Sequence, residues 1–296
     1  MTRAALSFVV LLLFCCKQPS KFEQEEARVE RAQAAITPLH TIKKPIQPGD
    51  WLETHQEAGQ TFAQFRSQNA SRSYSKSILY IQPLGDFTKE EQQIVADTAE
   101  AMQIFFGVKT QFLTSLPTSS IPKEARRINE HTERPQLLTD YILEKLLVPE
   151  IPSDALAVIA FTATDLWPGE GWNFVFGQAL FDKPVGVWSL ARMGDPKTEY
   201  AKCLQRTLKI ALHETGHMLG IKHCTAYECG MGGTNSLEET DMHPMAFCPV
   251  CERKLWWSLE LDIQTRYSQL SALAKKKGLR DEAAFWEASA KSVAQD

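Results

Sequence analysis

The chain has 296 residues, a formal net charge of −4 and a hydrophobic fraction of 44%. A chain of this length can bury one good-sized core with additions, and its composition is ordinary for a globular protein. Because there is no basic excess, we do not expect binding to nucleic acid, and the short run Lys275–Lys277 is interpreted as a solvated helix face.

The first 16 residues have the features of an export signal. Arg3 precedes an apolar run over residues 4–14, which has the length of a signal-peptide core and is too short to span a bilayer. A cysteine at the end of such a run resembles a bacterial lipoprotein signal, with Cys16 as the lipidated residue. We therefore expect an exported protein, either a lipoprotein attached to the membrane through Cys16 or a periplasmic or secreted protein. The alternatives are an uncleaved anchor or buried helix, and a cytoplasmic location.

Residues 17–36 are polar and helix-prone, which indicates a tether or a mobile helix. Residues 37–76 contain several prolines and glycines and are interpreted as an irregular arm packed on the domain. Both segments precede the first predicted strand.

Strands and helices then follow in mixed order, which predicts an α/β sandwich with a mixed sheet. Thr88 and Glu91 have the spacing of a capping box at the start of the first helix. The strand at 155–164 is strongly apolar and should be buried on both faces, and the last two strands are shorter and should lie at an edge. We expect helices at 88–106 and 136–147 and strands at 78–84, 108–113, 155–164, 174–179 and 186–191.

The segment 198–219 lacks proline and has apolar residues at helical spacing, so we predict a helix. Residues four apart share one helix face, which places His213 and His217 side by side, with Glu214 one position round. Gly220 can end the helix with positive φ and turn His223 back towards the other two imidazoles.

Three imidazoles leave one open position on a tetrahedral zinc ion, where a water binds and its pKa falls to about 7. Glu214 would then act as general base. The alternative, three unrelated histidines on a core helix, is disfavoured because three of the seven histidines lie in one short window. The charge of Glu214 also interrupts an apolar run, where a buried face would disfavour it.

A second cluster follows directly, with two closely spaced cysteine pairs at Cys224, Cys229, Cys248 and Cys251. Such pairs predict a closed, structural four-cysteine zinc site that supports the segment after His223. Two alternatives stay open: a redox dithiol at the Cys-x-x-Cys pair, and two disulfides in an exported chain. Cys203 is left over and is interpreted as a buried small residue.

Beyond the cysteines, residues 254–277 and 281–294 have apolar residues at helical intervals. We predict a helical hairpin that turns at Gly278 and packs on the parent domain. A partner-binding helix is the alternative.

At this point the residues resemble a known family. The pattern HExxHxxGxxH resembles the metzincin metallopeptidases, and its continuation into the four cysteines is similar to the archaemetzincins. Further similar stretches lie at 49–51, 59–62, 82–87, 174–192 and 248–255, so the resemblance covers roughly residues 37 to 256.

The resemblance implies roles for individual residues. Glu214 would be the catalytic acid and base, and Met231 the methionine of the Met-turn beneath the metal, with Met242 and Met245 as weaker candidates. An antiparallel edge strand would border the cleft and pair with an extended peptide, with Trp188 or its neighbours on it. Two zinc ions would be bound, the catalytic one by His213, His217 and His223, and the structural one by Cys224, Cys229, Cys248 and Cys251.

We therefore predict a metzincin-like mixed β-sheet with an active-site helix, a C-terminal subdomain stabilised by a four-cysteine zinc site, and C-terminal helices. The function is hydrolysis of a peptide or protein substrate by a monomeric zinc metallopeptidase. The alternatives are a non-catalytic zinc-stabilised protein that binds peptides or a partner, and a thiol oxidoreductase. The predicted regions are a signal peptide or lipoprotein signal at 1–16, a tether and arm at 17–76, the peptidase domain at 77–256 and a helical extension at 257–296.

Overall fold

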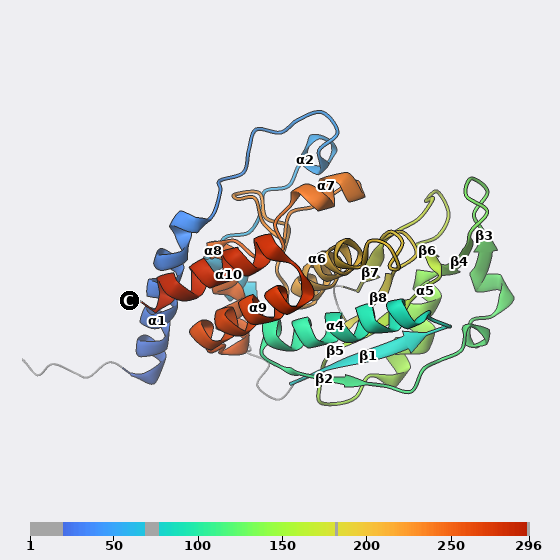
Figure 1. Ribbon diagram of the computed structural model, residues 1–296, viewed down its shortest axis with the longest axis horizontal. Coiled ribbons are helices and arrows are strands. Elements are labelled where there is room, and N and C mark those ends of the chain that lie inside the picture. The colour runs from blue at the N-terminus through green and yellow to red at the C-terminus, as the bar shows by residue number, and fades with distance from the viewer. Residues whose placement is uncertain (1–19, 69–76, 181–182, 295–296) are drawn as a thin grey trace, which may run out of the picture.

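The centre of the fold is a mixed sheet in the strand order β2-β1-β5-β8-β7 (Figure 1). This is seen in a computed structural model that describes residues 20–68, 77–180 and 183–294. Strands β2, β1, β5 and β8 run parallel, and β7 runs antiparallel to β8 at the edge. The strands are β1 Ile78–Leu84, β2 Lys109–Phe112, β5 Ala155–Thr162, β7 Gly177–Ala179 and β8 Val185–Ser189. The predicted mixed α/β fold is confirmed.

The sheet separates two hydrophobic layers, and all eight residues of β5 are buried. Ile159 and Phe161 face helices α4 (Lys89–Phe106) and α6 (Tyr200–Met218), which pack against each other on that face. Val158 and Ala160 point to the opposite layer. Burial on both faces explains the unbroken apolar run that predicted this strand. Helix α4 begins with the predicted capping box, in which Glu91 accepts a hydrogen bond from the Thr88 amide at 2.8 Å.

The helix predicted at 136–147 is wrong in its first part. Strand β4, Pro135–Leu138, pairs with β3, Arg126–Ile128, and with β6, Asp165–Trp167, in a second, small sheet. The Gln136 amide is fully buried and donates to Asp165 Oδ2 at 2.8 Å, so pairing across the sequence overrides local helix preference. The chain becomes helical only at α5, Thr139–Tyr141, and continues as a π-helix over Ile142–Leu147.

The segment before β1 packs on the domain. Helix α1, Lys21–Ile36, contacts α8 (Pro249–Leu259) and α10 (Arg280–Val293) and buries Val29, Ala32 and Ile36. Residues 17–36 were predicted to form a tether or a mobile helix; a helix is present, and it packs on α8 and α10. The arm that follows contains α2, Trp51–Thr54, and α3, Phe62–Gln68. Short 3-10 turns lie at Thr37–Leu39, Thr118–Ser120, Lys123–Ala125 and Val148–Glu150.

The C-terminal hairpin is confirmed. Helix α9, Ile263–Lys277, and α10 pack on each other and meet at Gly278, which has φ 76°. Helix α9 also contacts α4, so the hairpin packs on the parent domain. In the described parts of the chain, no helix is both long and apolar enough to cross a membrane. The predicted signal at 1–16, with Cys16, lies outside the described residues.

A buried ion pair fixes this hairpin to the domain. Arg266 of α9 contacts Glu252 of α8 at 3.1 and 3.2 Å and donates to the Phe105 carbonyl of α4 at 2.6 Å. Both side chains are at most 2% exposed. Burial raises the pKa of Glu252, and the Arg266 guanidinium opposes that rise.

We predict that Glu252→Gln lowers the free energy of unfolding by about 3 kcal/mol, because it leaves the Arg266 charge buried without a counter-charge. Urea denaturation followed by circular dichroism measures the change. The control is Glu287→Gln, which breaks an exposed pair with Lys275 and Lys291 and should leave the midpoint nearly unchanged. Equal midpoints for the two variants would contradict the expectation.

Candidate active site

Helix α6 and the turn after it bring three histidines together. His213 and His217 lie one turn apart on α6, and Gly220, with φ 81°, reverses the chain so that His223 joins them. One ligand atom from each ring lies within 4.8 Å of the others. The turn is held by hydrogen bonds from the Gly220 amide to His217 O at 2.8 Å and from the Ile221 amide to Gly216 O at 3.0 Å.

The Nδ1 atoms of His213 and His217 are bound by backbone carbonyls. His213 Nδ1 lies 2.9 Å from Gly230 O, and His217 Nδ1 lies 2.7 Å from Ile221 O. A carbonyl accepts only, so each Nδ1 carries a proton and each Nε2 presents a lone pair. Burial lowers the pKa of His217 and of His223, which favours the neutral, metal-binding form.

The third ring is held by a carboxylate that sequence reasoning missed. Both oxygens of Glu57 lie 2.9 Å from His223 Nδ1. Glu57 belongs to the arm between α2 and α3, where Gln60 also binds the turn through Gly220 O and the Lys222 amide, each at 3.2 Å. The stretches at 49–51 and 59–62 bracket Glu57 and were noted for their resemblance, but no spacing linked this residue to His223.

Glu214 stands beside the three rings and is half-buried. In the part of the chain that the structure describes, its carboxylate has no hydrogen-bond partner, so both oxygens can accept a proton from a bound molecule. Burial raises the pKa of this carboxyl, and the His213 ring opposes that rise. A raised pKa brings a carboxylate closer to the value that suits a general base near neutral pH.

Met231 packs directly beneath the helix that carries the histidines. A Cβ atom at Gly216 would lie 2.5 Å from Met231 Sδ, so a side chain at this point of α6 would displace the Met231 side chain. Met231 is fully buried, and its carbonyl accepts a hydrogen bond from the Cys224 amide at 2.7 Å. Met242 is 74% exposed and does not occupy such a position, and Met245 is buried two residues before Phe247.

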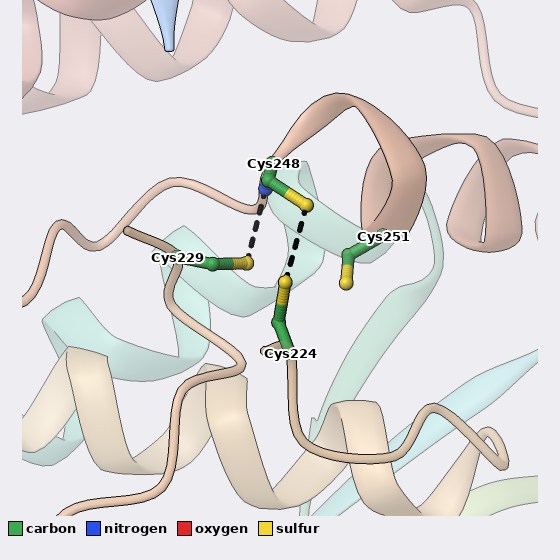
Figure 2. Close-up of side chains that lie close together, drawn as sticks. All are labelled: Cys224, Cys229, Cys248 and Cys251. Carbon is green, nitrogen blue, oxygen red and sulfur yellow. Dashed lines mark hydrogen bonds between the residues drawn. The ribbon is translucent and has the colours of Figure 1, made fainter. Parts of the chain in front are cut away.

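The four cysteines form a second cluster, drawn in Figure 2. Their sulfurs all lie within 4.8 Å of one another, and the Cys224 and Cys248 sulfurs are 3.6 Å apart. A tetrahedron with zinc–sulfur bonds of about 2.3 Å has edges of roughly 3.8 Å. Cys229 Sγ accepts hydrogen bonds from the Met231 and Cys248 amides at 3.3 and 3.1 Å, which stabilise a thiolate. The donor set therefore fits zinc.

The cysteines are not paired as disulfides. Of the cysteines that the structure describes, all five are free and buried. The 3.6 Å between the Cys224 and Cys248 sulfurs is far above the roughly 2.05 Å of a disulfide bond. Cys203 lies apart from the cluster on α6, 1% exposed, as expected for a small core residue.

The histidines open onto a cavity of about 820 Å³. Residues of α6 line it, the edge strand β7 lies along it, and segment 230–244 and Trp51 of the arm also contribute. Figure 1 shows α2, which begins at Trp51, beside α7 (Leu237–Met242), and the Trp51 amide donates to Glu239 Oε1 of α7 at 2.9 Å. The cavity has the size of a ligand site.

The prediction that Trp188 lies on the edge strand is wrong. Trp188 belongs to β8, which pairs with β5 on one side and β7 on the other. Its ring is 1% exposed and lies against Phe161, at 6.2 Å between ring centroids. The edge strand is β7, whose residues line the cavity, and β8 is an inner strand rather than the edge strand that was expected.

Comparison with known proteins agrees with this site. Residues 134–256 match Peptidase family M54. Archaemetzincin-2 of Mus musculus is 33% identical, and the match covers 85% of this chain and 80% of the mouse protein. Archaemetzincin-1 of Homo sapiens is 30% identical, and the match covers 75% of this chain and 51% of the human protein.

A solved structure is also similar. The crystal structure of archaemetzincin from Methanopyrus kandleri has a TM-score of 0.52 and 27% identity, and the match covers 64% of this chain and 98% of the archaeal one. The protein is thus a zinc metallopeptidase. It belongs to the archaemetzincin family, for which zinc is the expected metal.

Proposed function

We propose that the protein hydrolyses peptide bonds at a zinc ion held by His213, His217 and His223, with Glu214 as general base. The observation that carries this proposal is the convergence of three Nε2 lone pairs beside an unpaired carboxylate at one cavity. Bound zinc would supply a Lewis acid that polarises the scissile carbonyl and lowers the pKa of water to about 7.

The chain's own groups would then handle the protons. Glu214 would take a proton from the attacking water and deliver it to the nitrogen of the leaving amine. The carbonyls of Gly230 and Ile221 and the Glu57 carboxylate would hold the rings in place while the charge at the site changes. A peptide would lie along the free edge of β7 and pair with its backbone as an added strand.

We also propose that the four cysteines bind a second, structural zinc ion. Cys224 follows His223 in the chain, and Cys229 precedes Gly230, whose carbonyl holds His213. A metal at the cysteines would therefore fix both ends of the loop that completes the histidine site. The export signal at 1–16, with lipidation at Cys16, is proposed from the sequence alone.

For Glu214→Gln we predict zinc content equal to wild type and a loss of peptide cleavage of at least about 100-fold, because the general base is gone. Cleavage is measured with a library of internally quenched peptides and zinc by elemental analysis. Turnover equal to wild type would contradict the mechanism. Two bound zinc ions in a wild type that cleaves no peptide of the library would favour a binding protein.

For Cys248→Ser we predict that about one zinc ion per chain is lost, because a four-cysteine site needs all of its thiolates to stay closed. Elemental analysis after gel filtration gives the ratio. The matched control is Cys203→Ala, which removes a buried cysteine outside the cluster and should keep the wild-type zinc content. Unchanged zinc in Cys248→Ser would rule out the second site.

For Glu57→Ala we predict a 10- to 100-fold weaker zinc affinity at the histidine site, about the usual effect of removing an outer carboxylate partner of a histidine ligand. Competition with a chromophoric chelator measures the affinity, and the cysteine site should keep its metal. Glu53→Ala, a change in the same arm at an exposed carboxylate, is the control. Equal affinity in both variants would show that Glu57 does not support His223.

A further inference from the structure

A lysine lies in the floor of the cavity close to the histidines. Lys209 is on α6 four residues before His213, so the two side chains share one helix face. Lys209 is 8% exposed, and it is part of the cavity lining. Among the described residues that line the cavity, it is the single lysine or arginine.

The ammonium group of Lys209 has carbonyl partners only. Nζ donates to the carbonyls of Thr240 and Asp241 in α7 at 3.0 and 2.9 Å. An ammonium has three N–H donors, so two of them are used. The nearby Asp241 carboxylate is bound by Arg206 instead, at 2.8 and 2.6 Å. Over the described ranges of the chain, no ion pair includes Lys209.

Such a group favours an incoming anion. Burial lowers the pKa of the Lys209 ammonium, and the Glu282 and Asp241 carboxylates, which lie near it without forming an ion pair, oppose that fall. A carboxylate in the cavity would accept the third N–H in a charge-assisted hydrogen bond and so form the direct ion pair that these two acids do not form. The acids that line the cavity, Asp140 and Glu214, would repel the same carboxylate elsewhere, which leaves Lys209 as its favoured partner among the lining side chains.

We propose that Lys209 recognises a carboxylate of the bound peptide, so that the enzyme prefers an acidic side chain or a free C-terminus close to the scissile bond. This inference rests on the proposed peptidase function. Four residues of helix rise roughly 6 Å. An extended peptide rises roughly 3.3 Å per residue, so the carboxylate belongs to one of the two residues nearest the cleaved bond.

A purely structural role is the competing interpretation. The Thr240 and Asp241 carbonyls lie in the last turn of α7, where a cation stabilises the helix end. In that case Lys209 would affect the stability of α7 and not the choice of substrate. The two interpretations predict different ratios of kcat/KM between a peptide with the carboxylate and its neutral partner. This ratio does not depend on how much of a variant is active.

The test compares matched peptides with full-length, zinc-loaded protein. One arm uses C-terminally amidated, internally quenched peptides that carry either Glu or Gln at the residue just before the scissile bond, or at the residue just after it. The other arm uses short peptides without acidic side chains, as free acid or as amide. The variants are Lys209→Met, which keeps the apolar stem, and Lys209→Gln, which keeps N–H donors for the α7 carbonyls. Lys202→Met removes an exposed lysine from the same helix and is the control.

We expect wild type and Lys202→Met to favour the carboxylate member of at least one pair by about tenfold in kcat/KM. The arm that shows the preference identifies its source, a side chain or a C-terminus. In both Lys209 variants the ratio should fall to within about twofold of one. If Lys209→Met does not fold, as judged by its melting temperature, Lys209→Gln decides alone.

Two outcomes would overturn the proposal. A wild type without preference in either arm excludes carboxylate recognition, and an unchanged ratio in the Lys209 variants assigns the preference to another group, the histidine-bound metal included. If the wild type cleaves no peptide, the proposed function fails, but the same pairs still test Lys209 through their dissociation constants, measured by fluorescence anisotropy. Tighter binding of the carboxylate peptide that is lost in Lys209→Gln would then support a carboxylate site in a non-catalytic protein.

Discussion

The site depends on hydrogen bonds to the three imidazoles, in which one acceptor group binds the Nδ1 atom of each ring. The His213 and His217 rings are fixed by the carbonyls of Gly230 and Ile221, and the His223 ring is fixed by Glu57. Each bond sets the tautomer and aims Nε2 at a common point. None of the three acceptors lies on α6, so the helix offers two ligands but does not orient them. Orientation comes from the turn after the helix, from the loop that reaches Gly230 and from the arm.

The cysteine cluster and the histidine cluster are therefore parts of one assembly. The loop between them begins at Cys224, beside His223, and returns through Cys229 to Gly230 and Met231. Met231 contacts α6 at Gly216, where a side chain would displace it. Displacement of the cysteine loop would therefore shift three groups together. They are the Gly230 carbonyl that binds His213, Cys224 next to His223, and Met231 beneath α6. The buried pair of Glu252 and Arg266 extends this rigidity to the C-terminal hairpin, because Glu252 follows Cys251 directly.

Local spacing made much of this predictable. The helix of His213 and His217, the turn at Gly220, the cysteine pairs, the capping box of α4 and the buried strand β5 all follow from patterns of a few residues. The failures involve partners distant in sequence. Strand β4 forms because β3 and β6 pair with it, and Trp188 is buried because β7 lies outside β8. Glu57 becomes part of the site only through the contact of the arm with His223. No period or motif encodes such contacts.

The long-range contact made by the arm also constrains the order in which the site can assemble during folding. The Glu57–His223 pair joins residues 166 positions apart, and the arm precedes every strand of the central sheet. During synthesis the arm is complete long before α6 exists, and it has no histidine to hold until most of the chain has followed. Closing so long a loop is slow relative to forming local helices. The contact that orients the third ligand can therefore form only after α6 and the turn at Gly220 have been synthesised.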